Sequence, residues 1–550
     1  MRCALLKVSS ERQLGSKVSR RLFSCVRLVE MGNHQTVSKD VKKAFEDQGQ
    51  GHVFKFLDSL SKDEEDAFAK QLKEVDVKRV NELFKGSMAG VGEQTAGEIT
   101  PVSRDDVAGL EDVKKNAAGW TEEAYKAISE GKVAMLILSG GQGTRLGFDR
   151  AKGMYDLSLP SSKVIFQLQA ERLLRLQEIV EKKYPEAAKK GTVRLPWYLM
   201  TSPLNDADTK GFFKEHNYFG LKKEDVFFFA QGTLPCMTNE GKIILQSKNQ
   251  LAVAPDGNGG IYMSMLNSGA LADMEKRGIE SIHVCSVDNA IARVADPVFV
   301  GYCRERKADV GNKGCPKVSW DEKVGVMAKK DGKFSVVEYT EITEENAKQT
   351  SSDGSLLFST GNICNHYFSV EFIRSKVLSS LSNCYHIQKK KIPAADDKGE
   401  TVKPTENNGI KLEMYIFDVF PLASTMAILE CDRASEFTPV KNAPGSATDS
   451  PDTARAMIFA EHKKWLLAAG GKVTGEADAA CEISGLVSYA GEDLKDITES
   501  VESFALPLYI RKSTEAGADK NEGEVVSKDG AKVQVTHFVN TSGVNVYQVK

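Results

Sequence analysis

The chain has 550 residues, a formal net charge of −3 at pH 7, and 41% hydrophobic and 27% charged residues. This length exceeds what one hydrophobic core normally organises, so we expect a soluble globular protein with two or three domains. The nearly balanced charge argues against a dedicated nucleic-acid binder, and no apolar run approaches the roughly 20 residues that span a bilayer.

The first 30 residues contain seven Lys or Arg against two Glu, with several serines. This composition is typical of a transit peptide and also of a disordered basic tail, so we assign residues 1–40 to a disordered or targeting extension. The ten cysteines form no C-x-x-C pair, and the eight histidines show no metal-binding spacing. The chain is therefore expected to be a reduced, cytoplasmic protein without a zinc site, with organelle targeting as the alternative.

Residues 41–130 are predicted to form a mainly helical N-terminal domain. Ser61 is followed three residues later by Glu64, the spacing of a capping box. Apolar residues then recur at helical spacing, and Gly86 is expected to end the helix.

From residue 131 the pattern changes to short apolar runs that alternate with helical stretches such as residues 163–183. The runs include VAMLIL at 133–138, and others lie within LPWYLMTS, DVFFFAQ and SIHVCSVDN. This alternation predicts an α/β fold whose Rossmann-like, mostly parallel mixed sheet is covered on both faces, over residues 131–445. Asp331-Gly332 lies between two alternating runs and predicts a hairpin.

Residues 441–456 are rich in Pro, Gly, Ser and Thr and predict an exposed loop near a domain border. A helix around AMIFAEHKKWLLAAGG and several short strands follow. We therefore expect residues 446–550 to form a small α+β C-terminal domain.

The stretch ILSGGQGTRLG, residues 137–147, combines glycines with a cation. Its spacing fits neither the Rossmann fingerprint, because Gly147 comes one residue too late, nor the Walker A loop, because no Lys-Ser or Lys-Thr follows. A tight turn without a ligand is one interpretation. Arg145 and Lys152 favour another, because a guanidinium and an ammonium beside backbone N–H groups suit a triphosphate.

The segment LSGGQGTRLGFDRAKGMYDLSLPS closely resembles the signature of the eukaryotic UDP-N-acetylhexosamine pyrophosphorylases. The resemblance continues in order from about residue 50 to about residue 510, through QGTLPC, APDGNGG, SIHVCSVDN, SSDGSLLFSTGNICNH, NGIKLEMYIFDVF and EFTPVKNA. Gln142 and Asn258 stand where related UDP-glucose pyrophosphorylases typically carry leucine and histidine. Ala151 and Ser139 depart from the usual proline and alanine without removing a functional group.

The resemblance implies a nucleotidyltransferase domain of the GT-A-like kind and an activity. UTP and N-acetylglucosamine 1-phosphate would give UDP-N-acetylglucosamine and pyrophosphate with Mg²⁺, for which Mn²⁺ can substitute, in a monomer or weak homodimer without a nucleic-acid partner. It also implies catalytic roles for Arg145, Lys152 and Lys441, and Asp288 as the metal ligand. The implied substrate-binding residues are Gly140, Gly141, Gln231, Asn258, Gly259, Glu338, Tyr339, Asn362, Lys411, Tyr415 and Phe417.

Several alternatives remain open at this point. Asp206-Ala207-Asp208 contains the D-x-D string of metal-dependent glycosyltransferases, although we expect Asp206 to cap a helix. Asp288 could cap a turn, and Tyr415 and Phe417, expected on one side of a strand, could be core residues. A non-catalytic nucleotide-sugar-binding subunit is a further alternative.

Overall fold

The computed structural model describes residues 36–89, 97–381, 384–515, 523–528 and 530–550. Residues 1–35 of the predicted extension lie outside the described residues. The chain forms two compact units, each built from segments that are distant in sequence. The first comprises the chain up to Lys85 with Leu234–Ala254 and Gln388–Lys411, and the second comprises Gly86–Thr233, Pro255–Ile387 and Leu412–Lys550.

Helices form most of the N-terminal part of the first unit: α2 (Lys39–Asp47), α3 (Lys62–Lys73) and α4 (Val77–Ala89). The predicted capping box is confirmed, because Glu64 N–H donates to Ser61 Oγ and the Glu64 carboxylate accepts from Ser61 N–H. The predicted stop at Gly86 is wrong. The helix breaks earlier, where Asp76 Oδ1 accepts the N–H of Arg79 and starts α4, which then continues through Gly86.

The other segments of the first unit pack on these helices through apolar and polar contacts. One core joins Phe45, Phe68 and Leu72 to Met237 and Leu251. Four short strands form two antiparallel pairs: β7 (Leu245–Ser247) with β8 (Gln250–Leu251), and β16 (Ala394–Ala395) with β17 (Thr401–Val402). Two further pairs lie where the chain passes between the units: β6 (Thr233–Pro235) with β9 (Val253–Pro255), and β15 (His386–Lys390) with β18 (Gly409–Glu413).

One large sheet organises the second unit, with the strand order β2-β19-β11-β14-β10-β3-β4-β5. The strands are β2 (Val107–Ala108), β3 (Val133–Leu138), β4 (Trp197–Thr201), β5 (Val226–Ala230), β10 (Ser281–Ser286), β11 (Val310–Pro316), β14 (Thr360–Ser369) and β19 (Met426–Glu430). In this order only β14 runs antiparallel to its neighbours. The predicted mostly parallel mixed sheet is therefore confirmed.

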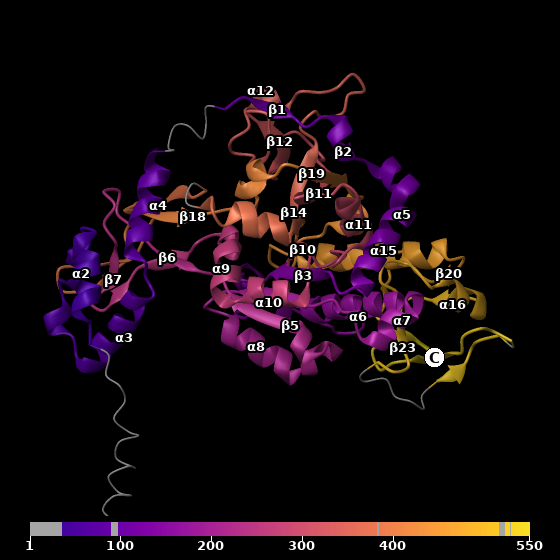
Figure 1. Ribbon diagram of the computed structural model, residues 1–550. Coiled ribbons are helices and arrows are strands. Elements are labelled where there is room, and N and C mark those ends of the chain that lie inside the picture. The colour runs from indigo at the N-terminus through magenta and orange to yellow at the C-terminus, as the bar shows by residue number, and fades with distance from the viewer. Residues whose placement is uncertain (1–35, 90–96, 382–383, 516–522, 529) are drawn as a thin grey trace, which may run out of the picture. The chain divides into compact units, whose positions relative to one another are not determined.

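Helices cover both faces of this sheet (Figure 1). Helices α5 (Leu110–Ser129), α6 (Ile165–Lys183) and α11 (Pro297–Glu305) share a buried cluster with Met135 and Ile137 of β3. Tyr198 of β4 points the other way and donates to Asp273 of α10 (Ala270–Arg277), which follows α9 (Ile261–Ser268). None of the helices in the described part of the chain combines the length and apolar character needed to cross a membrane.

The remaining elements of the second unit are short. Before its C-terminal part, the further α-helices of this unit are α7 (Pro185–Lys190), α8 (Asp206–Glu215), α12 (Glu344–Ala347), α13 (Val370–Phe372) and α14 (Arg433–Glu436). Strand β12 (Val326–Lys330) pairs with β1 (Ile99–Pro101), β13 (Lys333–Val337) and β14. The hairpin predicted at Asp331-Gly332 is confirmed, because both residues have positive φ between β12 and β13.

A smaller sheet forms the C-terminal part of the second unit, with the order β21-β23-β26-β25-β24. Its strands are β21 (Cys481–Ile483), β23 (Leu508–Lys512), β24 (Glu524–Val525), β25 (Val535–Val539) and β26 (Asn545–Val549), and β20 (Val473–Thr474) pairs with β22 (Phe504–Ala505). Helix α15 (Pro451–Ala468) contributes Leu466 to the core of this region, and α16 (Lys495–Ser500) contributes Ile497. Helix α15 begins inside the predicted loop because Ser450 caps it and Pro451 takes its first position.

Candidate active site

Most of the predicted site residues lie at one edge of the large sheet. Strands β3, β4, β5 and β10 are parallel, so their carboxyl ends share that edge. The glycine loop follows β3, Gln231 follows β5, and Asp288 follows β10. Because β14 is antiparallel to β10, its first residues, including Asn362, lie at the same edge. This is the edge where α/β sheets bind ligands.

The glycine loop is held closed by its own backbone. Gly143 N–H donates to Arg150 O over 3.0 Å, and Lys152 N–H donates to Gly141 O over 3.2 Å. A Cβ atom at Gly143 would lie 2.9 Å from Phe148 O, so only glycine fits there. Arg145 therefore lies within the closed loop, and Lys152 lies where the chain comes back to Gly141.

Four charged side chains surround the end of this loop. Lys152 Nζ lies 3.9 Å from Asp288 Oδ2, and each side chain is less than one-fifth exposed. Burial lowers the pKa of Lys152, the Asp288 carboxylate opposes this effect, and the charges of Lys441 and Arg145 lower the pKa further. Asp288 and Lys441 lie far in sequence from Arg145 and Lys152, which share the glycine loop, and the fold brings the four charges within electrostatic reach.

The two arginines of the loop differ in their partners. Arg150 donates two hydrogen bonds to the Asp208 carboxylate, over 2.7 and 3.0 Å. Arg145 is exposed and forms no ion pair with any residue that the structure describes. The guanidinium of Arg145 is therefore the one with open hydrogen-bonding capacity beside Lys152.

The D-x-D string does not form a metal site of the glycosyltransferase kind. Asp208 is engaged by Arg150, and Asp206 accepts from Thr201 Oγ1 and Lys210 Nζ over 2.6 Å each. The expected capping role of Asp206 is also wrong, because Asn205 is the N-cap and Asp206 is the first residue of α8. Asp206 and Asp208 lie in the first turn of α8, and their carboxylates form ion pairs with Lys210 and Arg150.

Asp288 is held through its backbone rather than its carboxylate. Asp288 O accepts from Val440 N–H over 2.9 Å, which places Lys441 beside it. Among the described residues, its carboxylate accepts no backbone hydrogen bond, so the turn-cap alternative has no support here. The neighbouring Asn289, which sequence reasoning missed, donates to Glu436 O and accepts from Thr438 N–H.

A second group of site residues packs around the loop of residues 255–260. Gln231 donates to Gly257 O, and its Oε1 would lie 3.1 Å from a Cβ atom on Gly140. Asn258 Oδ1 accepts from Ile416 N–H over 3.0 Å. A Cβ atom on Gly259 would lie 2.6 Å from Tyr415 O, so the backbone of Tyr415 requires glycine there.

A third group lies around Gly325. Asn362 N–H donates to Gly325 O over 2.7 Å, and a Cβ atom on Gly325 would lie 2.8 Å from Glu338 Oε1. Burial raises the pKa of Glu338, and the nearby carboxylates of Glu341 and Asp418 raise it further. Tyr339 is 44% exposed.

Tyr415 and Phe417 lie together, but not on a strand. Strand β18 ends at Glu413, and Ile416–Leu422 forms a 3₁₀ helix that begins where Tyr415 N–H donates to Asp418 Oδ2 over 2.6 Å. The predicted strand is therefore wrong, because Asp418 caps a turn at this point. The two rings are stacked, with centroids 5.2 Å apart.

His386 and Asp418 complete this part of the site, and sequence reasoning identified neither. His386 Nε2 lies 2.9 Å from Asp418 Oδ1, and the His386 ring centroid is 5.1 Å from that of Tyr415. Burial would lower the pKa of His386, but Asp418 raises it above the ordinary value. The spacing of 32 residues carries no signal from which the pair could have been inferred.

Lys411 is the one predicted site residue that belongs to the first unit, on β18.

These features define a class: α/β proteins with a glycine loop and clustered cations at the carboxyl edge of a mostly parallel sheet, a site suited to nucleoside phosphates. The chain belongs to the UTP–glucose-1-phosphate uridylyltransferase family, whose model matches residues 82–526. The resemblance found in the sequence is thereby confirmed at the level of the family.

Individual members of the family are similar to this chain over most of its length. The UDP-N-acetylhexosamine pyrophosphorylase-like protein 1 of Xenopus tropicalis is 40% identical over 504 residues, 86% of this chain and 97% of that protein. The UDP-N-acetylglucosamine diphosphorylase 2 of Arabidopsis thaliana is 40% identical over 486 residues, with 87% and 94% covered. The crystal structure of the uridine diphosphate N-acetylglucosamine pyrophosphorylase from Trypanosoma brucei matches with a TM-score of 0.71 at 31% identity, covering 88% of this chain and 96% of that one.

Proposed function

We propose that the protein is a uridylyltransferase that makes UDP-N-acetylglucosamine and pyrophosphate from UTP and N-acetylglucosamine 1-phosphate. The observation that carries the proposal is the Lys152–Asp288 pair with Arg145 and Lys441 at the carboxyl edge of the sheet. Relatives of about 40% identity that carry pyrophosphorylase or diphosphorylase names support the same reaction.

The chemistry requires charge and alignment more than a base. A phosphate oxygen of the sugar phosphate forms a bond to the α-phosphorus of UTP, while the bond from that phosphorus to the bridging oxygen breaks and pyrophosphate leaves. The attacking oxygen is already anionic, so no proton must be removed. The barrier lies in bringing two polyanions into line. We assign Arg145 and Lys152 to the leaving pyrophosphate and the α-phosphate, and Lys441, from the C-terminal side of the chain, to the phosphate.

The residues at this edge fit a magnesium ion. Asp288 offers a carboxylate that is not consumed by backbone contacts, and Mg²⁺ commonly takes one or two protein carboxylates and completes its shell with substrate phosphates and water. Among the described residues, no group of three or more His, Cys, Asp or Glu side chains could hold a metal, which suits that mode. When bound, the metal would supply positive charge to the phosphates.

The uridine and the sugar would be recognised by the two other groups of residues. We assign Gly140, Gly141, Gln231, Asn258 and Gly259 to UTP. We assign Glu338, Tyr339, Asn362, Tyr415 and Phe417 to the sugar and its phosphate.

The acetamido group would be recognised by an apolar wall beside polar partners. The stacked rings of Tyr415 and Phe417 offer such a wall, and Asn362 is the candidate polar partner. An additional methyl group in an apolar slot is worth only about 1–3 kcal/mol, whereas unpaired polar groups penalise the wrong ligand more strongly. We therefore expect N-acetylglucosamine 1-phosphate to be used best, N-acetylgalactosamine 1-phosphate less well and glucose 1-phosphate poorly.

The test is pyrophosphate release when the purified protein is mixed with UTP, Mg²⁺ and each of the three sugar 1-phosphates. We expect release in the stated order of kcat/KM and a UDP-sugar product. Binding of the UDP-sugar without turnover would instead identify a non-catalytic binding subunit. Transfer of a sugar from the UDP-sugar to an acceptor, with UDP as product, would identify a glycosyltransferase.

A further inference from the structure

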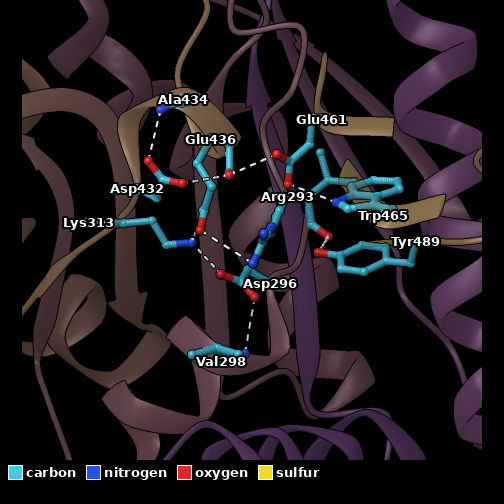
Figure 2. Close-up of polar contacts among 12 residues, drawn as sticks. Arg293, Asp296, Val298, Lys313, Asp432, Ala434, Glu436, Glu461, Trp465 and Tyr489 are labelled. Atoms are coloured by element: carbon cyan, nitrogen blue, oxygen red, sulfur yellow. Dashed lines mark hydrogen bonds and ion pairs between the residues drawn. The ribbon is translucent and has the colours of Figure 1, made fainter. Parts of the chain in front are cut away.

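A largely buried cluster of charges is centred on Lys313 of β11. We call it the Lys313 cluster and define it as Lys313, Asp296, Glu436 and Arg293 (Figure 2). The Lys313 side chain is 1% exposed, and its Nζ contacts the Asp296 carboxylate and Glu436 Oε2, the latter over 2.6 Å. Arg293 lies 3.4 Å from Glu436 Oε1. The cluster thus balances two cations against two carboxylates.

Each carboxylate fixes one of the two segments that carry proposed site residues. Asp296 caps α11 through Val298 N–H and ends the segment that begins after β10 with Asp288. Glu436 ends α14 and begins the segment that leads to Lys441. One ammonium group on a central strand therefore anchors both segments.

The same two segments are hydrogen-bonded to each other between the anchors and the site. Asn289 donates to Glu436 O over 2.7 Å and accepts from Thr438 N–H over 3.0 Å. Val440 N–H then donates to Asp288 O over 2.9 Å. These hydrogen bonds set the position of Lys441 relative to Asp288. They begin at Glu436, whose carboxylate contacts Lys313.

Stability alone does not account for a charge at position 313. Burial would lower the pKa of Lys313, but Asp296 and Glu436 raise it above the ordinary value, so the ammonium stays charged in a site closed to water. Buried ion pairs are weak stabilisers, because desolvation offsets their attraction, and apolar residues of similar size often replace them without loss. What an apolar residue cannot do is hold two carboxylates from different segments at one point.

We propose that Lys313 is a positioning residue, whose ammonium sets the placement of Asp288 and Lys441 relative to each other for uridylyl transfer. The proposal rests on the proposed function of the site. Displacements of about 1 Å far from the reacting atoms can lower rates by about 10²-fold, so this placement matters for turnover.

Lys313→Met and a matched control, Lys163→Met, test the proposal. Lys163 is also a buried lysine held by two carboxylates, Glu171 over 2.7 Å and Glu515 over 2.5 Å, but it lies beside the C-terminal sheet. We expect both variants to lose thermal stability. Only Lys313→Met should lower kcat, by about 10- to 100-fold per folded molecule, while KM for UTP changes less than about threefold.

Two further measurements separate positioning from a purely structural role. Mn²⁺ binding in the presence of UTP, followed by electron paramagnetic resonance, should weaken about tenfold in Lys313→Met and stay unchanged in Lys163→Met, because Asp288 is displaced only in the former. The losses from Lys313→Met and Lys441→Ala should be less than multiplicative in the double variant, because part of the Lys313→Met loss comes from the displaced Lys441 side chain.

If Lys313→Met does not fold, the same measurements are made on the double variant Lys313→Met/Glu436→Gln, which keeps the net charge of the cluster at zero. Normal kcat and Mn²⁺ affinity in a folded Lys313 variant would overturn the proposal. Failure of both Lys313 variants to fold, while Lys163→Met folds, would also overturn it in favour of a structural role. A wild-type protein that releases no pyrophosphate would contradict the proposed function, while the Mn²⁺ titration would still test the cluster.

Discussion

At the scale of single residues, the site depends on the different partners of side chains that look alike in the sequence. Arg145 and Arg150 are five residues apart in one loop and both are exposed, yet only Arg150 is held by a carboxylate, that of Asp208. A guanidinium already bound to a carboxylate has little capacity left for a phosphate. Local spacing does not reveal this difference, since Asp208 lies 58 residues from Arg150.

The first prediction compares these two arginines. Arg145→Ala should lower kcat by about 10²–10³-fold, because one charged donor to the transition state is worth about 3–4 kcal/mol. Lys152→Ala should behave in the same way. Arg150→Ala should stay within about threefold of the wild type, as expected for an exposed ion pair. Steady-state kinetics with UTP and N-acetylglucosamine 1-phosphate decide the matter, and equal losses in Arg145→Ala and Arg150→Ala would refute the assignment.

The second prediction concerns Asp288. Asp288→Asn keeps the size of the side chain but removes the charge, so activity with Mg²⁺ or Mn²⁺ should fall at least about 10²-fold and Mn²⁺ binding should weaken in parallel. Because Asp288 is held through its backbone, the thermal stability should change little. Undiminished turnover by Asp288→Asn would contradict the role of Asp288 as a metal ligand. Full wild-type activity in excess chelator would contradict the requirement for a metal.

At the scale of elements, the sequence predicted what local chemistry determines and missed what tertiary contacts determine. The capping box at Ser61, the hairpin at Asp331 and the buried strand at 133–138 follow from short patterns and are all present. The turn at Tyr415 was missed because Asp418, whose carboxylate caps it, sits within an apolar stretch that also fits a strand. Arg145 and Lys152 were predicted from the loop that carries them, and Asp288 and Lys441 from the resemblance. The closeness of these two pairs depends on strand order and could not be inferred from spacing.

The third prediction belongs to the 3₁₀ element of Ile416–Leu422. Phe417→Ala should reduce the ratio of kcat/KM for N-acetylglucosamine 1-phosphate over glucose 1-phosphate by about 10-fold, in line with 1–3 kcal/mol for apolar contacts. KM for UTP should change much less. The ratio is taken within one preparation, so the loss of packing at this buried ring does not affect it. Phe420→Leu, on the same element, is the control and should leave the ratio unchanged.

The fourth prediction concerns the contact of α15 with β21. Burial and, to a smaller extent, the charge of Arg172 lower the pKa of His462 to about 3, and its Nδ1 accepts from Ile483 N–H over 3.0 Å. Between pH 3 and the ordinary value of 6.5, the unfolded chain binds a proton that the folded chain excludes. The contribution of the neutral His462 to the free energy of unfolding is therefore fully present above pH 6.5 and is lost as the pH falls toward 3.

His462→Gln keeps an acceptor for Ile483 N–H but cannot titrate. The free energy of unfolding of the variant, measured by urea denaturation from pH 7.5 to 5, should depend less on pH, by up to about 1.4 kcal/mol per pH unit. Identical pH dependence in the wild type and the variant would show that His462 does not contribute.

At the scale of the whole molecule, residues distant in sequence build each unit. The first unit joins the N-terminal helices to residues 234–254 partly through Gln50, which donates to Gly241 O and accepts from Ile243 N–H. Such single amide contacts leave no periodic pattern, so the helices were predictable from the sequence but their partner segments were not. The mostly parallel sheet was predictable because alternating strands and helices impose it.

The last prediction concerns the N-terminus and uses two truncations. The family match begins at residue 82, and helix α2 is capped by Ser38, so removal of residues 1–35 should leave kcat within about twofold of the wild type and the melting temperature unchanged. Removal of residues 1–50 should behave differently, because it deletes α2 with Phe45, which is 1% exposed, and the Gln50 amide. Loss of a buried phenylalanine alone costs about 3–5 kcal/mol, so this variant should melt at a markedly lower temperature. Differential scanning calorimetry and pyrophosphate release compare the two proteins directly. If the shorter truncation already abolished folding or turnover, residues 1–35 would be part of the working enzyme rather than an extension of it.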